Sequence, residues 1–294
     1  MASFGETERK IISLFPVGTS FTYQETEYII LKSGKPCPSK GECKTDIYIL
    51  AKNINDETEK EFKISVKQPN ADFLENKTSL DRAISIFGNE KLVESVSSLK
   101  KKFEEDFLIH FISGHKTEAK TMRIGWKFEL MNKLSGKLSA EIPLSEAQIL
   151  DVYAGTTLPS EKKDCLLNGS RIENSGVAEY IWIGDINSIN KDEFFNEITL
   201  ISEYIQDKSV YFACKAVNYR AVPNKWDGNR PLSAYIDWSI VGGVLKAEVI
   251  CDRPLVMGAN SIGENIRKCL LTLRIDANNF DELKAKIDPS VKSY

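Results

Sequence analysis

The chain has few of the residues and patterns on which several common functions depend. Only two histidines occur, His110 and His115, and neither has a second histidine four residues away. This leaves little basis for a histidine metal site or a Ser-His-Asp triad. The six cysteines include no C-x-x-C pair, which favours reduced, mostly buried thiols over a disulfide framework or a zinc site.

Long apolar runs and a strong net charge are also missing. No segment approaches the roughly 20 apolar residues that span a bilayer, and the first residues do not resemble a secretion signal. We therefore expect a cytoplasmic protein with no membrane partner. The net charge of −3 gives no general attraction to nucleic acid, but it does not exclude a locally basic cleft.

The composition is that of an ordinary globular protein, with 294 residues, 42% hydrophobic and 28% charged. The first half predicts a helix over 5–15, then over 19–34 either a single strand or a hairpin that turns near Gln24 and Glu25, and a hairpin over 44–67. Helices are then predicted over 72–88, capped by Asn70 or Asp72 and ended by Gly88, and over 89–112.

In the second half, strands are predicted over 178–186, 209–219, 232–241 and 244–251, and helices over 190–205 and 280–287. The fold class is therefore α/β (α+β), a mixed central sheet flanked by helices with a mostly β C-terminal half. We expect a catalytic core in 1–120, with 121–294 completing it and carrying recognition elements. The simplest organisation is one continuous domain that contains both parts.

Three residues of the second hairpin form a chemically interesting set. Residues two apart on a strand share a face, so Ser65 and Lys67 point the same way and Asp46 on the neighbouring strand can lie opposite them. A carboxylate that anchors a divalent cation, beside an ammonium that neutralises a phosphate, suits phosphodiester hydrolysis. The alternative is a solvated cross-strand pair of charges.

The sequence around these residues resembles the active site of type II restriction endonucleases of the PD-(D/E)xK superfamily, nearest the MspI-like branch. In that branch a Gly-x-x-x-Lys-Thr-Asp stretch enters one strand, and the next strand carries an x-x-Lys whose first position is not acidic. The matching residues are Gly41, Lys44, Thr45 and Asp46 in "GECKTDIYIL", and Ser65, Val66 and Lys67 in "KISVKQ".

This resemblance implies a helix and a mixed central sheet that bears the site, and Mg²⁺-dependent cleavage of double-stranded DNA. Asp46 would be the metal ligand, Lys67 the catalytic lysine, and Ser65 the variant of the usual carboxylate. A DNA methyltransferase would be a genetic companion rather than a bound subunit. The resemblance leaves open another nuclease task, such as nicking, junction or RNA cleavage, and also a catalytically decayed DNA-binding protein.

A serine at position 65 removes one anionic ligand from such a site. Mg²⁺ needs only one or two carboxylates, so the Val66 carbonyl, waters and phosphate oxygens could complete its coordination. Glu42 and Glu75 are spare acids that either replace the missing ligand or are solvated surface residues. A rival E-x-K pair, Glu61 and Lys63, ranks second because it lies nearer the entry of the strand.

Glu8, with Glu6 beside it, is either an outer acid of the site or part of an acidic first turn that complements the helix dipole. Lys44 and Gln68 are candidate DNA contacts beside the site, although Gln68 is expected to face the other side of its strand. Lys32, Lys35 and Lys40 flank the loop before Asp46 and could hold phosphate.

A loop in "VNYRAVPNKWDGNRP" carries side chains suited to the major groove of DNA. Arginine reads guanine and asparagine reads adenine through paired hydrogen bonds. The candidate DNA-binding residues in this loop are Arg220, Asn224, Lys225, Asn229 and Arg230. The alternative is a Pro/Gly-rich connection between two strands whose charges only solvate it.

Overall fold

The computed structural model describes residues 4–76, 78–106, 108–113, 118–185, 187, 189–222 and 224–293. The chain divides into two compact units, each built from two stretches of sequence. Unit 1 comprises Met1–Asp72 with Leu144–Ser209, and unit 2 comprises Phe73–Pro143 with Val210–Tyr294. Units formed in this way differ from the expected division at residue 120, because the first stretch of unit 2 is inserted into unit 1.

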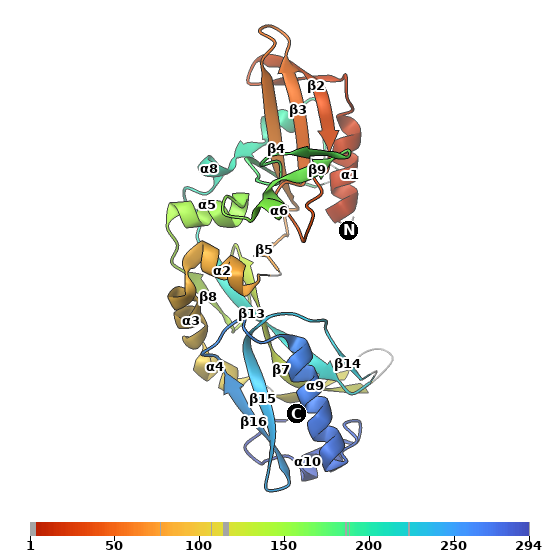
Figure 1. Ribbon diagram of the computed structural model, residues 1–294, viewed down its shortest axis with the longest axis vertical. Helices are drawn as coiled ribbons and strands as arrows, with labels where there is room; N and C mark the ends of the chain where they lie inside the picture. The colour runs from red at the N-terminus through yellow and green to blue at the C-terminus, as the bar shows by residue number, and fades with distance from the viewer. Residues whose placement is uncertain are drawn as a thin grey trace. The chain divides into compact units, whose positions relative to one another are not determined.

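Unit 1 is built on a mixed sheet with the strand order β1-β2-β3-β4-β11-β12. Figure 1 shows β2, β3 and β4 side by side. Strands β1 to β4 form an antiparallel meander, β11 runs parallel to β4, and β12 is antiparallel to β11. The mixed sheet with flanking helices confirms the α/β class. The six strands are Ser20–Tyr23, Thr26–Gly34, Ile47–Asn53, Glu59–Lys67, Tyr180–Ile183 and Thr199–Leu200.

The two predicted hairpins are both present in unit 1. Gln24 and Glu25 form the β1–β2 turn with φ of 48° and 65°, the left-handed backbone that two-residue hairpin turns use. In β4 the side chains alternate as expected. Phe62, Ile64 and Val66 are buried in the core, and the face that carries Ser65 and Lys67 is opposite.

Aromatic rings fill the core between this sheet and its helices. Helix α1 (Phe4–Leu14) contributes Ile11, and Phe15 follows it. The ring of Phe21 stacks on that of Phe195, with centroids 3.6 Å apart, and Phe195 belongs to α7 (Phe194–Glu197). Burying rings of this size is the main favourable contribution to the stability of such a layer.

The rest of unit 1 consists of short elements. Helix α5 (Glu146–Ala154) begins with a capping box between Ser145 and Gln148 and ends at Gly155 in the left-handed conformation. The others are α6 (Ser160–Lys163), α8 (Ile201–Tyr204), and the two-stranded sheet of β9 (Cys165–Leu167) and β10 (Ser170–Ile172). The predicted helix over 190–205 is wrong, since β12 pairs with β11 and separates α7 from α8.

Unit 2 is built on a second sheet, with the order β14-β13-β7-β15-β16. Its main strands are β7 (Glu118–Met131), β13 (Val210–Arg220), β14 (Lys225–Trp226), β15 (Leu232–Val241) and β16 (Val244–Ile250). Three short strands extend it, with β5 (Phe73–Glu75) and β6 (Ile109–Ser113) pairing with β7 and β8 (Ser139–Ile142) pairing with β13. Helix α9 (Ala259–Leu273) contacts β15, and α10 spans Phe280–Ala285.

Two predicted helices in this region need correction. The helix predicted over 72–88 begins only at Leu80, as α2 (Leu80–Phe87), because Ser79 caps it through the Arg82 N–H. Neither Asn70 nor Asp72 is the cap. The helix predicted over 89–112 is instead α3 (Asn89–Ser97), α4 (Lys100–Glu105) and then β6, whose backbone pairs with β7. None of the helices described here is long and apolar enough to cross a membrane.

One close backbone approach positions the loop that leads to Asp46. The carbonyl oxygen of Gly176 accepts hydrogen bonds from the N–H groups of Lys44 (2.9 Å) and Thr45 (3.3 Å). A Cβ atom at position 176 would lie 2.1 Å from the Lys162 carbonyl oxygen and 2.8 Å from the Cys165 sulfur. Only glycine allows this approach without displacing the backbone.

We therefore expect Gly176→Ala to lower the free energy of unfolding by about 1–3 kcal/mol, the usual range for an overpacked site. Urea denaturation measures this change. Gly5→Ala is the matched control, because a Cβ there meets only the end of the Arg9 side chain at 3.5 Å. Equal stability of the two variants would contradict the packing described for Gly176.

Candidate functional site

Asp46 lies where β3 begins and β4 ends. Its N–H donates to the Ile64 carbonyl oxygen at 2.9 Å. Its carboxylate oxygen Oδ2 accepts the Val66 N–H at 2.7 Å and the Ser65 hydroxyl at 3.4 Å. A backbone N–H and a hydroxyl from the neighbouring strand thus fix the orientation of this carboxylate.

Lys67 extends the same face of β4, two residues beyond Ser65. Burial raises the pKa of Asp46 to about 6, and Glu8 adds to the rise, whereas Lys67, the Val66 N–H and Lys35 lower it. Lys67 is the strongest of these opposing groups. The structure therefore brings Asp46 and Lys67 together on one side of the sheet, within electrostatic reach of each other.

Two further charged side chains approach this pair from other elements. Glu8 of α1 is buried, with 8% of its surface exposed, and forms an ion pair with Lys35, which directly follows β2. Glu8 and Lys35 both influence the pKa of Asp46. Glu8 is therefore part of this charge cluster, and an acidic first turn alone does not account for its place.

Gln68 contacts α1 rather than the Lys67 side of the strand. Its Nε2 donates to the hydroxyl of Thr7 at 3.4 Å, and Thr7 is fully buried. This contact fixes the end of β4 against the helix that carries Glu8. Sequence reasoning did not identify Thr7, and only its position next to Glu8 could have indicated it.

The other candidates before β3 have more peripheral places. Lys44 is half-buried, and Glu42 is exposed in the loop. The Cγ of Lys44 would lie 2.7 Å from a Cβ at Gly155, so the stem of this lysine packs against the end of α5. The side chain of Val66 is buried in the core, and its N–H is committed to Asp46.

Glu75 lies in unit 2, on strand β5, and the helix predicted to carry it begins later. Its carboxylate oxygen Oε1 accepts hydrogen bonds from Arg82 Nε at 3.1 Å and Nη2 at 2.9 Å. Both side chains are largely buried. This forked ion pair gives Glu75 a structural partner within its own unit.

In the rival pair, Glu61 and Lys63 contact each other, and Tyr48 also binds Glu61. Lys63 Nζ lies 3.7 Å from Glu61 Oε2, and the hydroxyl of the buried Tyr48 donates to the same carboxylate. Glu61 stands four residues before Ser65 on β4, about 13 Å along a strand. Lys63 is only two residues before Ser65, the same spacing as Lys67 on the other side, but its ammonium lies against Glu61 and not against a group of the Asp46 cluster.

The predicted recognition loop in unit 2 is the β13–β14 turn and the segment after it. Arg220 pairs with Asp227 at 2.9 Å. Asn224 Oδ1 accepts hydrogen bonds from the Tyr219 hydroxyl (2.7 Å) and Arg267 Nε (3.2 Å). Thus Arg220 and Asn224 both make contacts that shape the turn.

The segment after this turn is anchored to the start of α9. Asn229 Oδ1 accepts the Asn260 N–H at 3.2 Å, and the Trp226 ring lies under the Arg267 guanidinium at 4.8 Å. Lys225 is exposed and Arg230 is half-buried. The loop is therefore a braced surface feature that presents Lys225 to solvent.

Asp46 supplies one carboxylate, the kind of hard oxygen ligand that a divalent cation takes. No cluster of three or more His, Cys, Asp and Glu side chains suitable for a metal occurs in the described part of the chain. Among the described residues, Asp46 uses only Oδ2 for hydrogen bonds, so Oδ1 can face a cation. Mg²⁺ keeps several waters and takes phosphate oxygens, so one or two carboxylates are sufficient.

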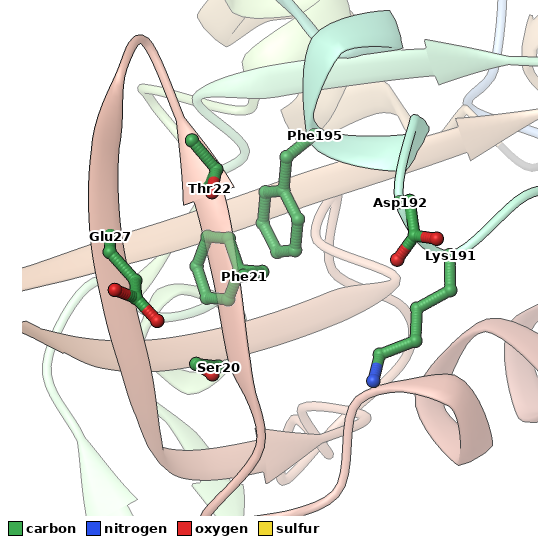
Figure 2. Close-up of a pocket in the computed structure, with 7 residues that line it drawn as sticks. All are labelled: Ser20, Phe21, Thr22, Glu27, Lys191, Asp192 and Phe195. Carbon is green, nitrogen blue, oxygen red and sulfur yellow. The ribbon is translucent and has the colours of Figure 1, made fainter.

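A separate pocket of about 210 Å³ lies at the β1–β2 hairpin of unit 1. Figure 2 shows its lining residues, with Glu27 on the hairpin and Lys191 and Asp192 on the opposite side. Glu27 and Lys35 are eight residues apart along or just beyond β2, a span of about 26 Å. The pocket is thus not part of the Asp46 cluster.

A comparison of the chain with protein-family models, curated proteins and solved structures finds no match to any of the three.

The raised pKa of Asp46 predicts a measurable effect on stability. A carboxyl whose folded pKa of about 6 exceeds its unfolded value near 3.8 destabilises the folded state increasingly as the pH rises from about 4 to about 6. Asp46→Asn removes this charge, and its amide oxygen can still accept the Val66 N–H. We expect it to raise the free energy of unfolding at pH 7.5 by about 1–3 kcal/mol.

Urea denaturation in the presence of EDTA tests this effect at pH 7.5 and pH 4.5. The gain should shrink at the lower pH, because Asp46 is then largely protonated in the folded state. A gain that does not depend on pH, or a loss of stability at pH 7.5, would show that the Asp46 carboxylate is not electrostatically penalised.

Proposed function

We propose that the protein is a Mg²⁺-dependent endonuclease that cleaves double-stranded DNA at specific sequences, as a type II restriction enzyme does. The observation that carries this proposal is the convergence of Asp46 and Lys67 at the adjoining ends of β3 and β4. A carboxylate for a cation and an ammonium for a phosphate are the two groups that such hydrolysis requires.

The arrangement of unit 1 supports a restriction-endonuclease-like core. A helix, α1, precedes an antiparallel meander, and β11 then adds to β4 in parallel. This is a mixed central sheet that bears the aspartate and the lysine on neighbouring strands, as the resemblance implies. Unit 2 would then supply contacts to DNA outside the reacting phosphate.

The chain's own residues have distinct roles in the proposed reaction. Asp46 Oδ1, waters and a phosphate oxygen would hold Mg²⁺, which supplies a water of lowered pKa and stabilises charge on the phosphoryl oxygens. Val66 and Ser65 hold the Asp46 carboxylate in place. The Lys67 ammonium would bind the scissile phosphate and stabilise the negative charge that develops in the transition state.

Ser65 makes this site poorer in negative charge than one with a carboxylate at that position. Its hydroxyl donates to Asp46 and does not repel it. A neutral residue at position 65 therefore stabilises the Asp46 anion that a second carboxylate would destabilise. The alternative is that Ser65 marks the loss of a catalytic carboxylate. The digestion described next distinguishes the two cases.

Incubation of the protein with a sequenced plasmid and Mg²⁺ tests the proposal. We expect discrete fragments whose ends map to one sequence. Asp46→Ala and Lys67→Ala should each reduce the cleavage rate by a factor on the order of 10²–10⁴, because each removes a group that acts in the transition state. Binding of both variants to duplex DNA without metal should persist.

Lys63→Ala is the matched control for Lys67→Ala. It removes a lysine from the same face of the same strand, where Lys63 pairs with Glu61. Its cleavage rate should stay close to that of the wild type. If Lys63→Ala loses activity and Lys67→Ala keeps it, the catalytic residues would be Glu61 and Lys63 and not Asp46 and Lys67.

Other outcomes of the same digestion separate the alternatives. Nicked circles without linear product would indicate a nicking enzyme, and cleavage of branched DNA or of RNA alone would indicate a junction or RNA nuclease. Tight binding of DNA with no turnover under Mg²⁺ or Mn²⁺ would indicate a binding protein whose site was lost at Ser65.

A second prediction concerns the braced loop of unit 2. Lys225 is exposed, and if it contacts a DNA phosphate, Lys225→Ala should weaken binding similarly for all sequences. The slope of log affinity against log salt should then fall by about one. Lys246→Ala is the control, since Lys246 lies on β16 with Asp288 3.6 Å away. Identical salt slopes for Lys225→Ala and the wild type would exclude this loop from the DNA interface.

A further inference from the structure

Lys35 has a place that the proposed reaction does not explain. It directly follows β2, half of its side chain is exposed, and its ammonium forms an ion pair with the buried Glu8 of α1. Although partial burial alone would lower the pKa of Lys35, Glu8 and Asp46 together raise it. The ammonium thus contacts the Glu8 carboxylate and lies within electrostatic reach of Asp46.

The charges of this cluster balance when no cation is bound. Glu8 and Asp46 carry two negative charges, and their mutual repulsion is part of what raises the pKa of Asp46. Lys35 and Lys67 carry two positive charges that oppose this rise. A divalent cation that enters such a neutral cluster gains little attraction unless a positive charge leaves or a phosphate arrives.

Of the two partners in the Glu8–Lys35 ion pair, Lys35 is the one that can move away with the smaller change to the structure. Glu8 is anchored on α1, whereas Lys35 lies on a loop and reaches Glu8 with a long, flexible side chain that is 51% exposed. Rotation of this side chain would free the Glu8 carboxylate and move the ammonium into solvent or onto a nearby phosphate. No movement of the backbone is needed for this step.

We propose that Lys35 is an internal counter-ion that occupies Glu8 in the free protein and must be displaced before the Glu8–Asp46 pair binds a divalent cation. This inference rests on the proposed function, because it concerns the metal of that same site. Lys35 is in this account a positioning residue, which makes metal binding weak without nucleic acid and stronger with it. Coupling between the two ligands is reciprocal, so the metal also strengthens nucleic-acid binding.

The test is a titration of the intact chain with Mn²⁺ in the absence of nucleic acid, with free Mn²⁺ measured by electron paramagnetic resonance. We expect Lys35→Met to bind Mn²⁺ at least about fivefold more tightly than the wild type, the lower end of typical couplings between sites. Lys35→Arg keeps the positive charge and should bind as the wild type does. The double variant Glu8→Gln/Lys35→Met should lose the gain.

Lys52→Met is the matched control, because Lys52 forms an ion pair with Glu57 (3.1 Å) at the other end of β3. It should leave the titration unchanged. Circular dichroism checks the fold of each variant, and Lys35→Gln, which keeps a polar head group, replaces Lys35→Met if the latter does not fold. Unchanged or weaker Mn²⁺ binding in Lys35→Met or Lys35→Gln overturns the inference.

The outcome is separable from that of the proposed function. If the wild type cleaves DNA and requires Asp46 and Lys67, but Lys35→Met titrates like the wild type, only the counter-ion role fails. If Lys35→Met shows the gain and Glu8→Gln/Lys35→Met loses it, while no nucleic acid is cleaved, the counter-ion role stands and the nuclease proposal fails.

Discussion

The hydrogen bond from the Val66 N–H to Asp46 Oδ2 is the contact on which the candidate site depends. It forms only because β3 begins directly beside the end of β4, where Val66 can turn its N–H toward the Asp46 side chain. The same register brings Asp46 opposite Ser65, and the alternation of side chains within β4 places Lys67 on the same face as Ser65. Burial makes the Asp46 anion costly, and this hydrogen bond and Lys67 are the main factors that offset the cost.

A cluster of charges held in this way costs stability that the aromatic core must offset. The other face of β4 carries Phe62, Ile64 and Val66, which are packed among the rings of Phe21, Tyr180 and Phe195. The rigid layer therefore lies directly beneath the charged end of the strand. Such support keeps a carboxylate and an ammonium at a fixed separation, which a site on a mobile loop would not.

Much of unit 1 could be predicted from local patterns. The alternation of polar and apolar residues from Glu61 to Lys67 indicated the buried face of β4, although Ser65 on the polar face is buried as well. The short polar link between Tyr23 and Thr26 indicated the hairpin. The partnership of Glu8 with Lys35 could not be predicted, because the two residues are brought together only by the packing of α1 at the end of the sheet.

The misassigned elements of unit 2 failed for two different reasons. Strand β5 has three residues and forms only because β7 lies beside it, so no local pattern marks it. Strand β7 does carry a local signal, since apolar residues recur at every second position from Met122 to Leu130, although no strand is predicted there. Arg123 of the same strand is buried against Asp106, so its charge is structural.

Ile262, Ile266 and Leu270 of α9 likewise follow helical spacing and are buried, although no helix is predicted there. The division into units had no comparable signal, since the insertion of Phe73–Pro143 between β4 and α5 is not marked by a change of composition.

The central claim is that Asp46 holds a divalent cation beside Lys67. Anomalous diffraction from crystals of the protein with duplex DNA and Mn²⁺ tests it most directly. The account predicts a peak about 2.0–2.3 Å from Asp46 Oδ1, with a phosphate oxygen in the same coordination shell and Lys67 against that phosphate. A Mn²⁺ ion bound elsewhere on the chain, with Asp46 still directed only to Val66 and Ser65, would contradict it.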